Sequence, residues 1–323
     1  MAALLKRYGS LLGMASIIVF FWIALPDTFM TARNWLNISQ QLSMLTVVAV
    51  TMTVVMVMGD FDLSVGAMAS LAGVIAAILF TQDWPIAAAI TAALLAGVIG
   101  GLFNGVLVSL IGILPFVATL ATLTMFSGAA FLISDGKTIF GRDIPQAFAD
   151  FARGGLPIGT LDDKPLILPA LTLLAALITL IIWVILEHTT YGRRLYAIGG
   201  NAEAARLAGV RTRALRLSAF AITGLGAAIA GLMYAARVAS ANPVQGDGLM
   251  LTAIAAVFLG MTVTRDGQPH VLATVAGVIT LGVLDNGLTQ LQVDSYIRQV
   301  LVGAIILIAV SVSAIGRRAL RLR

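Results

Sequence analysis

Two carboxylates lie close together in the segment Gly59-Asp-Phe-Asp-Leu-Ser-Val-Gly66, which separates two strongly apolar runs. Acids within a membrane are costly and usually functional, so Asp60 and Asp62 could couple transport to a cation. A structural interpretation competes, because Asp62 or Ser64 could accept hydrogen bonds from the free N–H groups of a following helix. Both acids are expected at the inner membrane boundary, which favours the structural interpretation.

A second polar patch interrupts the apolar run near residue 285. Asp285 is the one acid expected well inside a span, and Asn286, Gln290 and Gln292 follow it within a turn or two. Such a face can line a water-filled path for a solute, or it can bond to neighbouring helices. Both interpretations stay open.

Three glycines, Gly97, Gly101 and Gly105, recur every four residues on one face of another apolar run. Small residues at this spacing permit close helix packing in lipid. Asn104 lies beside this face, and its amide needs a partner in the bundle or in a wet cavity. It is a second candidate for the path, although packing alone also explains the glycines.

Other chemistry finds little support. The chain has no cysteine, and its two histidines, His188 and His270, are far apart in sequence, which argues against a metal site. Gly136-Lys137-Thr138 resembles the end of a phosphate-binding loop, but Phe131 stands where that loop needs glycine. We therefore expect no catalytic residues and no ATP site, and an integral-membrane enzyme is the weakest interpretation.

Membrane-spanning helices are expected to carry these residues. Hydrophobic residues make up 59% of the chain and charged residues 11%, against about 25% charged in soluble domains. An all-α, polytopic helix bundle follows, with about ten apolar runs of spanning length. The predicted spans are 10–25, 41–58, 64–80, 85–111, 115–133, 165–186, 215–236, 249–263, 270–290 and 297–315.

Charge asymmetry predicts the orientation of the chain. With both termini in the cytoplasm, 13 of the 20 basic residues fall on the inner side, in line with the positive-inside rule. Ten spans also permit an inverted repeat. Residues 1–323 then form a single transmembrane domain with a long outer loop at 134–164, in which 143–152 is amphipathic.

A basic segment at 187–216 carries six arginines between two apolar runs. Asn201 to Leu207 is expected to form a short helix that stops at Gly209. Such a helix could be a docking surface for another protein. It could equally be a solvated loop whose arginines set topology or touch anionic lipid.

Several stretches together resemble the permease subunits of bacterial ABC importers for monosaccharides, and the resemblance covers essentially the whole chain. Asp60 to Asp62, Ile133 to Lys137 and Asp285-Asn286 look most like an arabinose permease. The matching stretches are Gly59 to Gly66, Asn104-Gly105, Ile133-Ser-Asp-Gly-Lys137, Thr190-Tyr-Gly-Arg193 and Ala197 to Val210.

The resemblance implies a ten-helix fold of the vitamin-B12-importer type in the bacterial inner membrane. It also implies a second copy of the permease, a periplasmic sugar-binding protein, and a separate ATPase that holds ATP and Mg. Membrane lipid would surround the chain, and no nucleic acid is expected as a partner. A cation-coupled secondary transporter, using Asp60, Asp62 or Asp285, is the alternative.

The resemblance assigns residues 199–210 to a coupling helix that fits a groove of the ATPase. Arg193, Arg194 and Arg211 to Arg216 are expected to fix its orientation at the lipid surface. The chain departs from the family pattern in two places. The apolar-Pro ending that usually follows Gly209 is missing, and the residues at 246–267 differ from those usual in the family. The coupling residues are Gly200, Asn201, Glu203, Ala204, Ala205, Arg206 and Gly209, and the path residues are Asn104, Asp285, Asn286 and Gln290.

Overall fold

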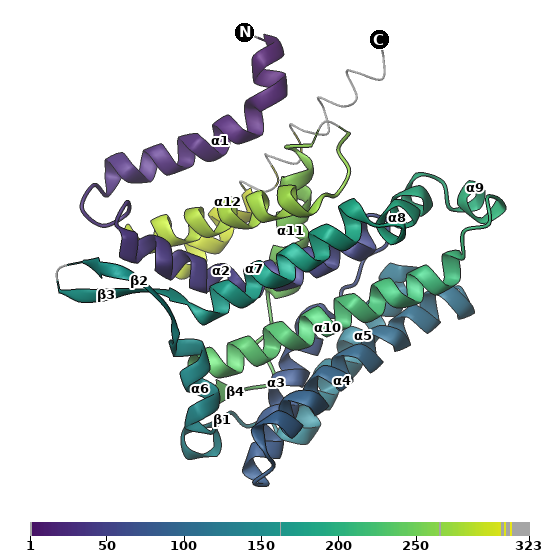
Figure 1. The fold of residues 1–323 in the computed structure, drawn as a ribbon, viewed down its shortest axis with the longest axis horizontal. Helices are drawn as coiled ribbons and strands as arrows, with labels where there is room; N and C mark the ends of the chain where they lie inside the picture. Colours follow the sequence, from purple (N-terminus) through teal and green to yellow (C-terminus); the bar gives the residue numbers. More distant parts are fainter. Residues whose placement is uncertain (1, 162, 265, 305–306, 308–310, 312–323) are drawn as a thin grey trace. The chain divides into compact units, whose positions relative to one another are not determined.

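The described part of the chain folds mostly into helices, with four short strands (Figure 1). The computed structural model describes residues 2–161, 163–264, 266–304, 307 and 311. Six of the described helices are long and apolar enough to cross a membrane, and three shorter apolar helices accompany them. An apolar core about 30 Å thick needs helices of roughly 20 residues. The prediction of an all-α membrane protein is therefore confirmed.

The predicted count of ten spans stays a prediction. Each of the first nine predicted segments overlaps a described apolar helix. The last one, 297–315, begins as helix over residues 295–304, and the remainder lies almost wholly outside the described residues. The vitamin-B12-type arrangement and the inverted repeat also stay predictions.

Residue contacts divide the chain into two compact units. The first unit comprises Met1–Leu42 and Ile254–Arg323, and the second comprises Ser43–Ala253. This division does not test the prediction that residues 1–323 form a single transmembrane domain. The described elements of the first unit are α1 (Ala2–Ala24), the first part of α2 (Ala32–Met56), most of α11 (Leu249–Met261), α12 (Val271–Gln290) and the helical residues 295–304.

The second unit contains the remaining helices and all the described strands. It begins with the larger part of α2 and ends with the start of α11. Its further elements are α3 (Val65–Thr81), α4 (Ile86–Val106), the π-helical turn η1 (Leu107–Ile111), α5 (Pro115–Ser134), β1 (Ile139–Phe140), the 3-10 turn η2 (Gly141–Asp143), α6 (Gln146–Arg153), β2 (Gly155–Leu161), β3 (Lys164–Pro169), α7 (Ala170–Trp183), the π-helical turn η3 (Val184–His188), α8 (Thr190–Gly200), α9 (Ala202–Leu207), α10 (Thr212–Val238) and β4 (Ser240–Ala241).

The core of the first unit is aromatic and aliphatic. The rings of Phe21 and Phe29 lie 5.4 Å apart, and both belong to a buried cluster with Val283 and Leu284 of α12. Gly287 lies directly beneath the Phe21 ring, where a larger side chain would collide with it. This contact fastens α1 to α12.

Helix α10 is the centre of the second unit, because it contacts α3, α4, α6, α8 and α9. Figure 1 shows α10 beside α4. A methyl group added at Gly101 would overlap the carbonyl oxygen of Phe220, and one at Gly97 would lie 2.6 Å from that of Gly224. The predicted role of the glycine face in close helix packing is confirmed. Van der Waals contact of this kind holds helices together where lipid removes the hydrophobic driving force.

The predicted outer loop carries more regular structure than expected. Helix α6 buries Phe148, Ala149 and Ala152, in agreement with its amphipathic pattern. Strand β2 then pairs antiparallel with β3, with Gly155 opposite Pro169. The short strands β1 and β4 form a second antiparallel pair.

The predicted span boundaries at α7 and α2 differ from the helix bounds of the structure. For the predicted span 165–186, the helix begins only at Ala170, because residues 165–169 belong to β3. The run Pro165-Leu-Ile-Leu-Pro169 is as apolar as a span, but its prolines suit an edge strand better than a helix interior. Helix α2, by contrast, begins at Ala32 rather than at residue 41. Its polar first part still buries Asn34 and Ile38.

Candidate functional site

The segment between α7 and α10 folds into two short helices, α8 and α9. In Figure 1 these helices follow α7 and lie next to the start of α10. The side-chain oxygen of Asn201 accepts a hydrogen bond from the backbone N–H of Ala204 at 2.9 Å, which satisfies a free donor at the start of α9. The predicted helix from Asn201 to Leu207 is confirmed.

Helix α9 ends in a glycine turn. Gly209 adopts φ +82°, a conformation that side chains rarely allow. Its N–H donates to the carbonyl of Arg206 at 3.0 Å, and the N–H of Val210 donates to the carbonyl of Ala205 at 3.0 Å. This pattern closes a helix by satisfying its last carbonyls. The glycine stop is confirmed, and α9 is capped at both ends.

The outer surface of α9 carries a fixed pair of opposite charges. Nη2 of Arg206 lies 2.6 Å from Oε1 of Glu203, and Nε of Arg206 donates to Oε2 at 3.0 Å. This hydrogen bond lowers the pKa of the Glu203 carboxyl. Ala204 and Leu207 are exposed beside the pair, whereas Ala205 is buried. A partner would meet two charges and small apolar side chains.

Two tyrosines fasten α8 to its surroundings. The hydroxyl of Tyr191 lies 2.8 Å from Oγ of Ser218 in α10. The hydroxyl of Tyr196 donates to Oε1 of Glu187 at 2.8 Å, within the turn that ends α7. Burial, followed by the Glu187 carboxylate, raises the pKa of Tyr196. The phenol therefore remains a hydrogen-bond donor at neutral pH.

The turn between α2 and α3 contacts this segment as well. Gly199 of α8 lies so close to the turn that an added methyl group would overlap the carbonyl oxygen of Val57. Asp60 pairs with Arg216 of α10, with Oδ2 and Nε 2.9 Å apart. The assignment of Arg216 to the lipid surface is therefore wrong, because a half-buried guanidinium facing a buried carboxylate is held by that charge.

Asp62 lies in a buried polar cluster that joins α3, α4 and α5. Its Oδ1 accepts from the N–H and the hydroxyl of Ser64, at 2.9 and 2.6 Å, and from the Asn104 amide at 3.4 Å. The Asn104 amide also donates to the Ser64 hydroxyl at 2.8 Å, and its oxygen accepts from Thr122 at 2.7 Å. Asp62 thus holds the start of α3, whereas the Ser64 side chain makes no cap.

Replacing Asn104 with alanine is expected to lower the free energy of unfolding by about 1–3 kcal/mol, because it removes the three hydrogen bonds that Asn104 makes to Asp62, Ser64 and Thr122 inside a buried cluster. Thermal unfolding in detergent measures this loss. Thr124→Val is a matched control near Thr122, since its exposed hydroxyl bonds to the carbonyl of Leu120 in its own helix; it should change stability by less than about 0.5 kcal/mol. An unaltered melting temperature for Asn104→Ala would show that the cluster does not stabilise the fold.

Two of the other predicted path residues form a polar chain in the first unit. Oδ1 of Asn286 accepts from the amides of Gln290, at 2.8 Å, and Asn34, at 3.1 Å. The Gln290 oxygen accepts from the hydroxyl of Thr28 at 2.7 Å. These amides therefore link α2, α12 and the loop after α1. Their role in a path, like that of Asn104, stays a prediction.

Asp285 differs from these amides because its side chain is exposed, near the end of α12. Its Oδ1 lies 3.2 Å from Nε of Arg298, which also contacts the hydroxyl of Thr289. Among the described residues, no three acidic or histidine side chains come together as metal ligands. Each acid considered for cation coupling is thus paired with an arginine side chain or accepts hydrogen bonds.

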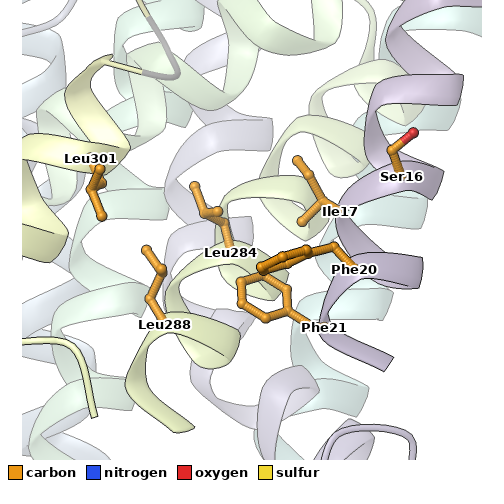
Figure 2. Close-up of a pocket in the computed structure, with 7 residues that line it drawn as sticks. All are labelled: Ser16, Ile17, Phe20, Phe21, Leu284, Leu288 and Leu301. Atoms are coloured by element: carbon orange, nitrogen blue, oxygen red, sulfur yellow. The ribbon is translucent and has the colours of Figure 1, made fainter. Parts of the chain in front are cut away.

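Figure 2 shows an apolar recess of about 360 Å³ in the first unit. Its one polar lining residue, Ser16, donates to the carbonyl of Leu12 in its own helix at 2.8 Å. A polar ligand needs several hydrogen-bond partners, so the recess does not suit one. The other lining residues are Ile17, Phe20, Phe21, Leu284, Leu288 and Leu301.

Two contacts near the short helices were not predicted from the sequence: Tyr191 with Ser218, which fastens α8, and Asp60 with Arg216, which joins α10 to the α2–α3 turn. Nothing local marks the tyrosine and the serine. One signal was available for the ion pair, because both charges were expected at the same inner boundary of the membrane. An acid at that depth needs a nearby cation.

Comparison with known proteins identifies the family of the chain. Residues 34–310 match the model of a family described as the permease component of branched-chain amino acid transport systems. The chain belongs to this permease family. It is 35% identical to the ribose import permease RbsC of Bacillus subtilis over 309 residues, which cover 95% of this chain and 92% of that protein.

Two further relatives of this permease come from Escherichia coli K12. The D-allose permease AlsC is 31% identical, with 94% of this chain and 90% of AlsC covered. The xylose permease XylH is also 31% identical, with 97% and 93% covered. No solved structure matches the chain. The permease is a membrane transport component of the ABC-importer class, in which ATP hydrolysis belongs to a separate ATPase.

Proposed function

We propose that this permease forms the translocation path of an ATP-driven monosaccharide importer in the bacterial inner membrane. The chain crosses the membrane ten times in a vitamin-B12-type arrangement, with both termini in the cytoplasm. Two copies enclose the path, and a periplasmic binding protein delivers the sugar. Residues 199–210 dock on a cytoplasmic ATPase, which binds ATP and Mg.

The observation that carries this proposal is the construction of the α8–α9 segment. Transmission of a movement from another subunit requires a stiff element that is firmly attached to the bundle. Helix α9 is capped by Asn201 and closed at Gly209, and Tyr191 bonds α8 to Ser218. The exposed pair of Glu203 and Arg206 offers a partner a defined pattern of charge. A solvated loop that merely sets topology would need none of these contacts.

The missing apolar-Pro ending does not weaken α9 itself. In place of that ending, Val210-Arg-Thr212 leads directly into α10, and the N–H of Thr212 donates to the carbonyl of Val210 at 2.9 Å. The connection between the docking helix and α10 is therefore short. Movement of α9 should displace the start of α10.

The substrate class rests on the relatives and on sequence resemblance. RbsC and XylH are named for ribose and xylose, and AlsC is named for allose. We propose a pentose, with arabinose as the first sugar to test. The path residues of this proposal, Asn104, Asp285, Asn286 and Gln290, would offer hydroxyl-compatible hydrogen bonds once the bundle opens.

The cation-coupled alternative has less support. Asp60 and Asp285 are each paired with an arginine, and Asp62 is bonded to Ser64 and Asn104. A coupling ion would have to displace these partners. The relatives are sugar permeases whose matches cover 95% and 97% of this chain, which also favours the ATP-driven interpretation.

Reconstitution in proteoliposomes tests the proposal. The permease is combined with its ATPase and the sugar-binding protein, and uptake of labelled arabinose, ribose, xylose and allose is measured. Uptake should require ATP and both partners, and should survive ionophores. Uptake without the ATPase that collapses with the ion gradient would establish the cation-coupled transporter instead.

A further inference from the structure

One ion pair joins the start of α10 to the turn between α2 and α3. Nε of Arg216 and Oδ2 of Asp60 lie 2.9 Å apart, without the alignment of a hydrogen bond, and Nη2 of Arg216 donates to Oδ1 at 3.4 Å. The two residues are 156 positions apart in the chain. The contact therefore ties together segments that the local backbone does not connect.

The pair is largely withdrawn from solvent. The side chain of Asp60 is 5% exposed and that of Arg216 is 29% exposed. An exposed pair contributes little, but removing one partner of a buried pair leaves a charge that its surroundings cannot accommodate. The exposed pair of Glu203 and Arg206 is the contrasting case on α9.

We call the two short helices α8 and α9 the docking segment. The turn that carries Asp60 contacts α8 of this segment and also α10. Gly199 of α8 packs against the carbonyl of Val57, at the start of the turn. Arg216 approaches from α10, which follows α9 after a short connection. A displacement of α8 and α9 therefore reaches the turn through packing and through charge.

The same turn leads into the buried cluster of the bundle. Asp62, two residues after Asp60, accepts hydrogen bonds from Ser64 and Asn104, and Thr122 completes the set. The hydroxyl of Thr119 also lies 3.4 Å from the carbonyl of Phe61, between the two acids. The turn is thus bonded to α4 and α5 as well as to α10.

We infer that Asp60 and Arg216 are positioning residues that transmit displacement of the docking segment to the α2–α3 turn, and so to helices α3, α4 and α5. This inference rests on the proposed function. Contiguous contacts alone do not establish energetic coupling, so the claim has to be tested by its effect on coupling. A purely structural pair would affect folding and leave the amount of sugar taken up per ATP unchanged.

The test uses the reconstituted importer, with Asp60→Asn, Arg216→Gln and the double variant. Three quantities are measured: basal ATP hydrolysis, hydrolysis stimulated by the sugar-loaded binding protein, and sugar taken up per ATP. Each single change should lower uptake per ATP about fivefold or more, the usual lower range of allosteric coupling, with basal hydrolysis unchanged. The double variant should be no worse than the poorer single one, because both remove the same contact.

Arg213→Gln is the matched control, since it removes an exposed arginine from the same end of α10. It should leave uptake per ATP unchanged. If Asp60→Asn does not fold, Arg216→Gln carries the comparison, and Arg216→Lys serves as the rescue variant because it keeps the positive charge. A lowered uptake per ATP for Arg216→Gln that recovers in Arg216→Lys would then support the inference, and a normal uptake per ATP for Arg216→Gln would overturn it.

The two proposals can fail separately. A normal ratio in both single variants, with a strongly sugar-stimulated unmodified importer, would overturn the positioning role and leave the proposed function intact. Fully additive losses in the double variant would also overturn it. An unmodified complex that shows no sugar-stimulated hydrolysis would refute the proposed function, and the inference with it.

Discussion

A Gly101→Val permease is expected to lose most of its folded yield. Even a methyl group at Gly101 would overlap the carbonyl oxygen of Phe220, and would lie 2.9 Å from Cα of Ala221. Both obstacles are backbone atoms, which cannot rotate away as a side chain can. Overpacking typically costs about 1–3 kcal/mol and more where the backbone must move, against a total stability of about 5–15 kcal/mol.

The measurement is the monodisperse fraction and melting temperature of the purified protein in detergent. Gly128→Val is the matched control, because Gly128 lies in α5 with nothing within 4 Å of its added carbon. The control should fold like the unmodified protein. Equal yields of the two variants would mean that α4 and α10 are not packed backbone to backbone.

Arg206→Glu is expected to lower sugar-stimulated ATP hydrolysis and sugar uptake at least about tenfold, within the usual range of coupling energies. The change breaks the pair with Glu203 and places two like charges on the docking surface of α9. The caps at Asn201 and Gly209 lie outside this contact, so α9 itself should persist. The loss of activity should appear in the maximal rate of sugar-stimulated ATP hydrolysis by the reconstituted complex.

Arg153→Glu provides the control for this prediction. Arg153 forms a similar exposed pair with Asp150 at 3.9 Å, also three residues apart, but on α6. On the proposed topology α6 faces the periplasm, so this change can alter only the concentration of binding protein that is required. If the maximal rate of sugar-stimulated ATP hydrolysis falls equally in both variants, α9 is not the docking surface.

The parts of this fold that were predictable from sequence are governed by local physics. Apolar runs of spanning length located nine helices, because burial in lipid requires continuous apolar sequence. Asn201 and Gly209 located α9, because a cap and a left-handed turn depend on neighbouring residues. The start of α7 was mispredicted since Leu166-Ile-Leu168 is apolar in a strand as in a span, and only its pairing with β2 distinguishes the two.

The candidate site depended on pairings that no local pattern contains. Asp60 and Arg216 are separated by most of the second unit, and Asn104 meets Asp62 from another helix. From the residue types alone, the acids could serve either cation coupling or the structure of the bundle. Only the packing of α10 against α3 and α4 shows what partners they have.

The most direct test of the account asks which part of the permease touches the ATPase. The chain contains no cysteine, so a single cysteine can be labelled with a photoreactive maleimide before the ATPase is added. Ala204→Cys lies on the exposed surface of α9, and Gly159→Cys lies on the exposed hairpin strand β2 as a control. We predict a crosslink to the ATPase from position 204 and none from position 159. A crosslink from position 159 with none from 204 would contradict it.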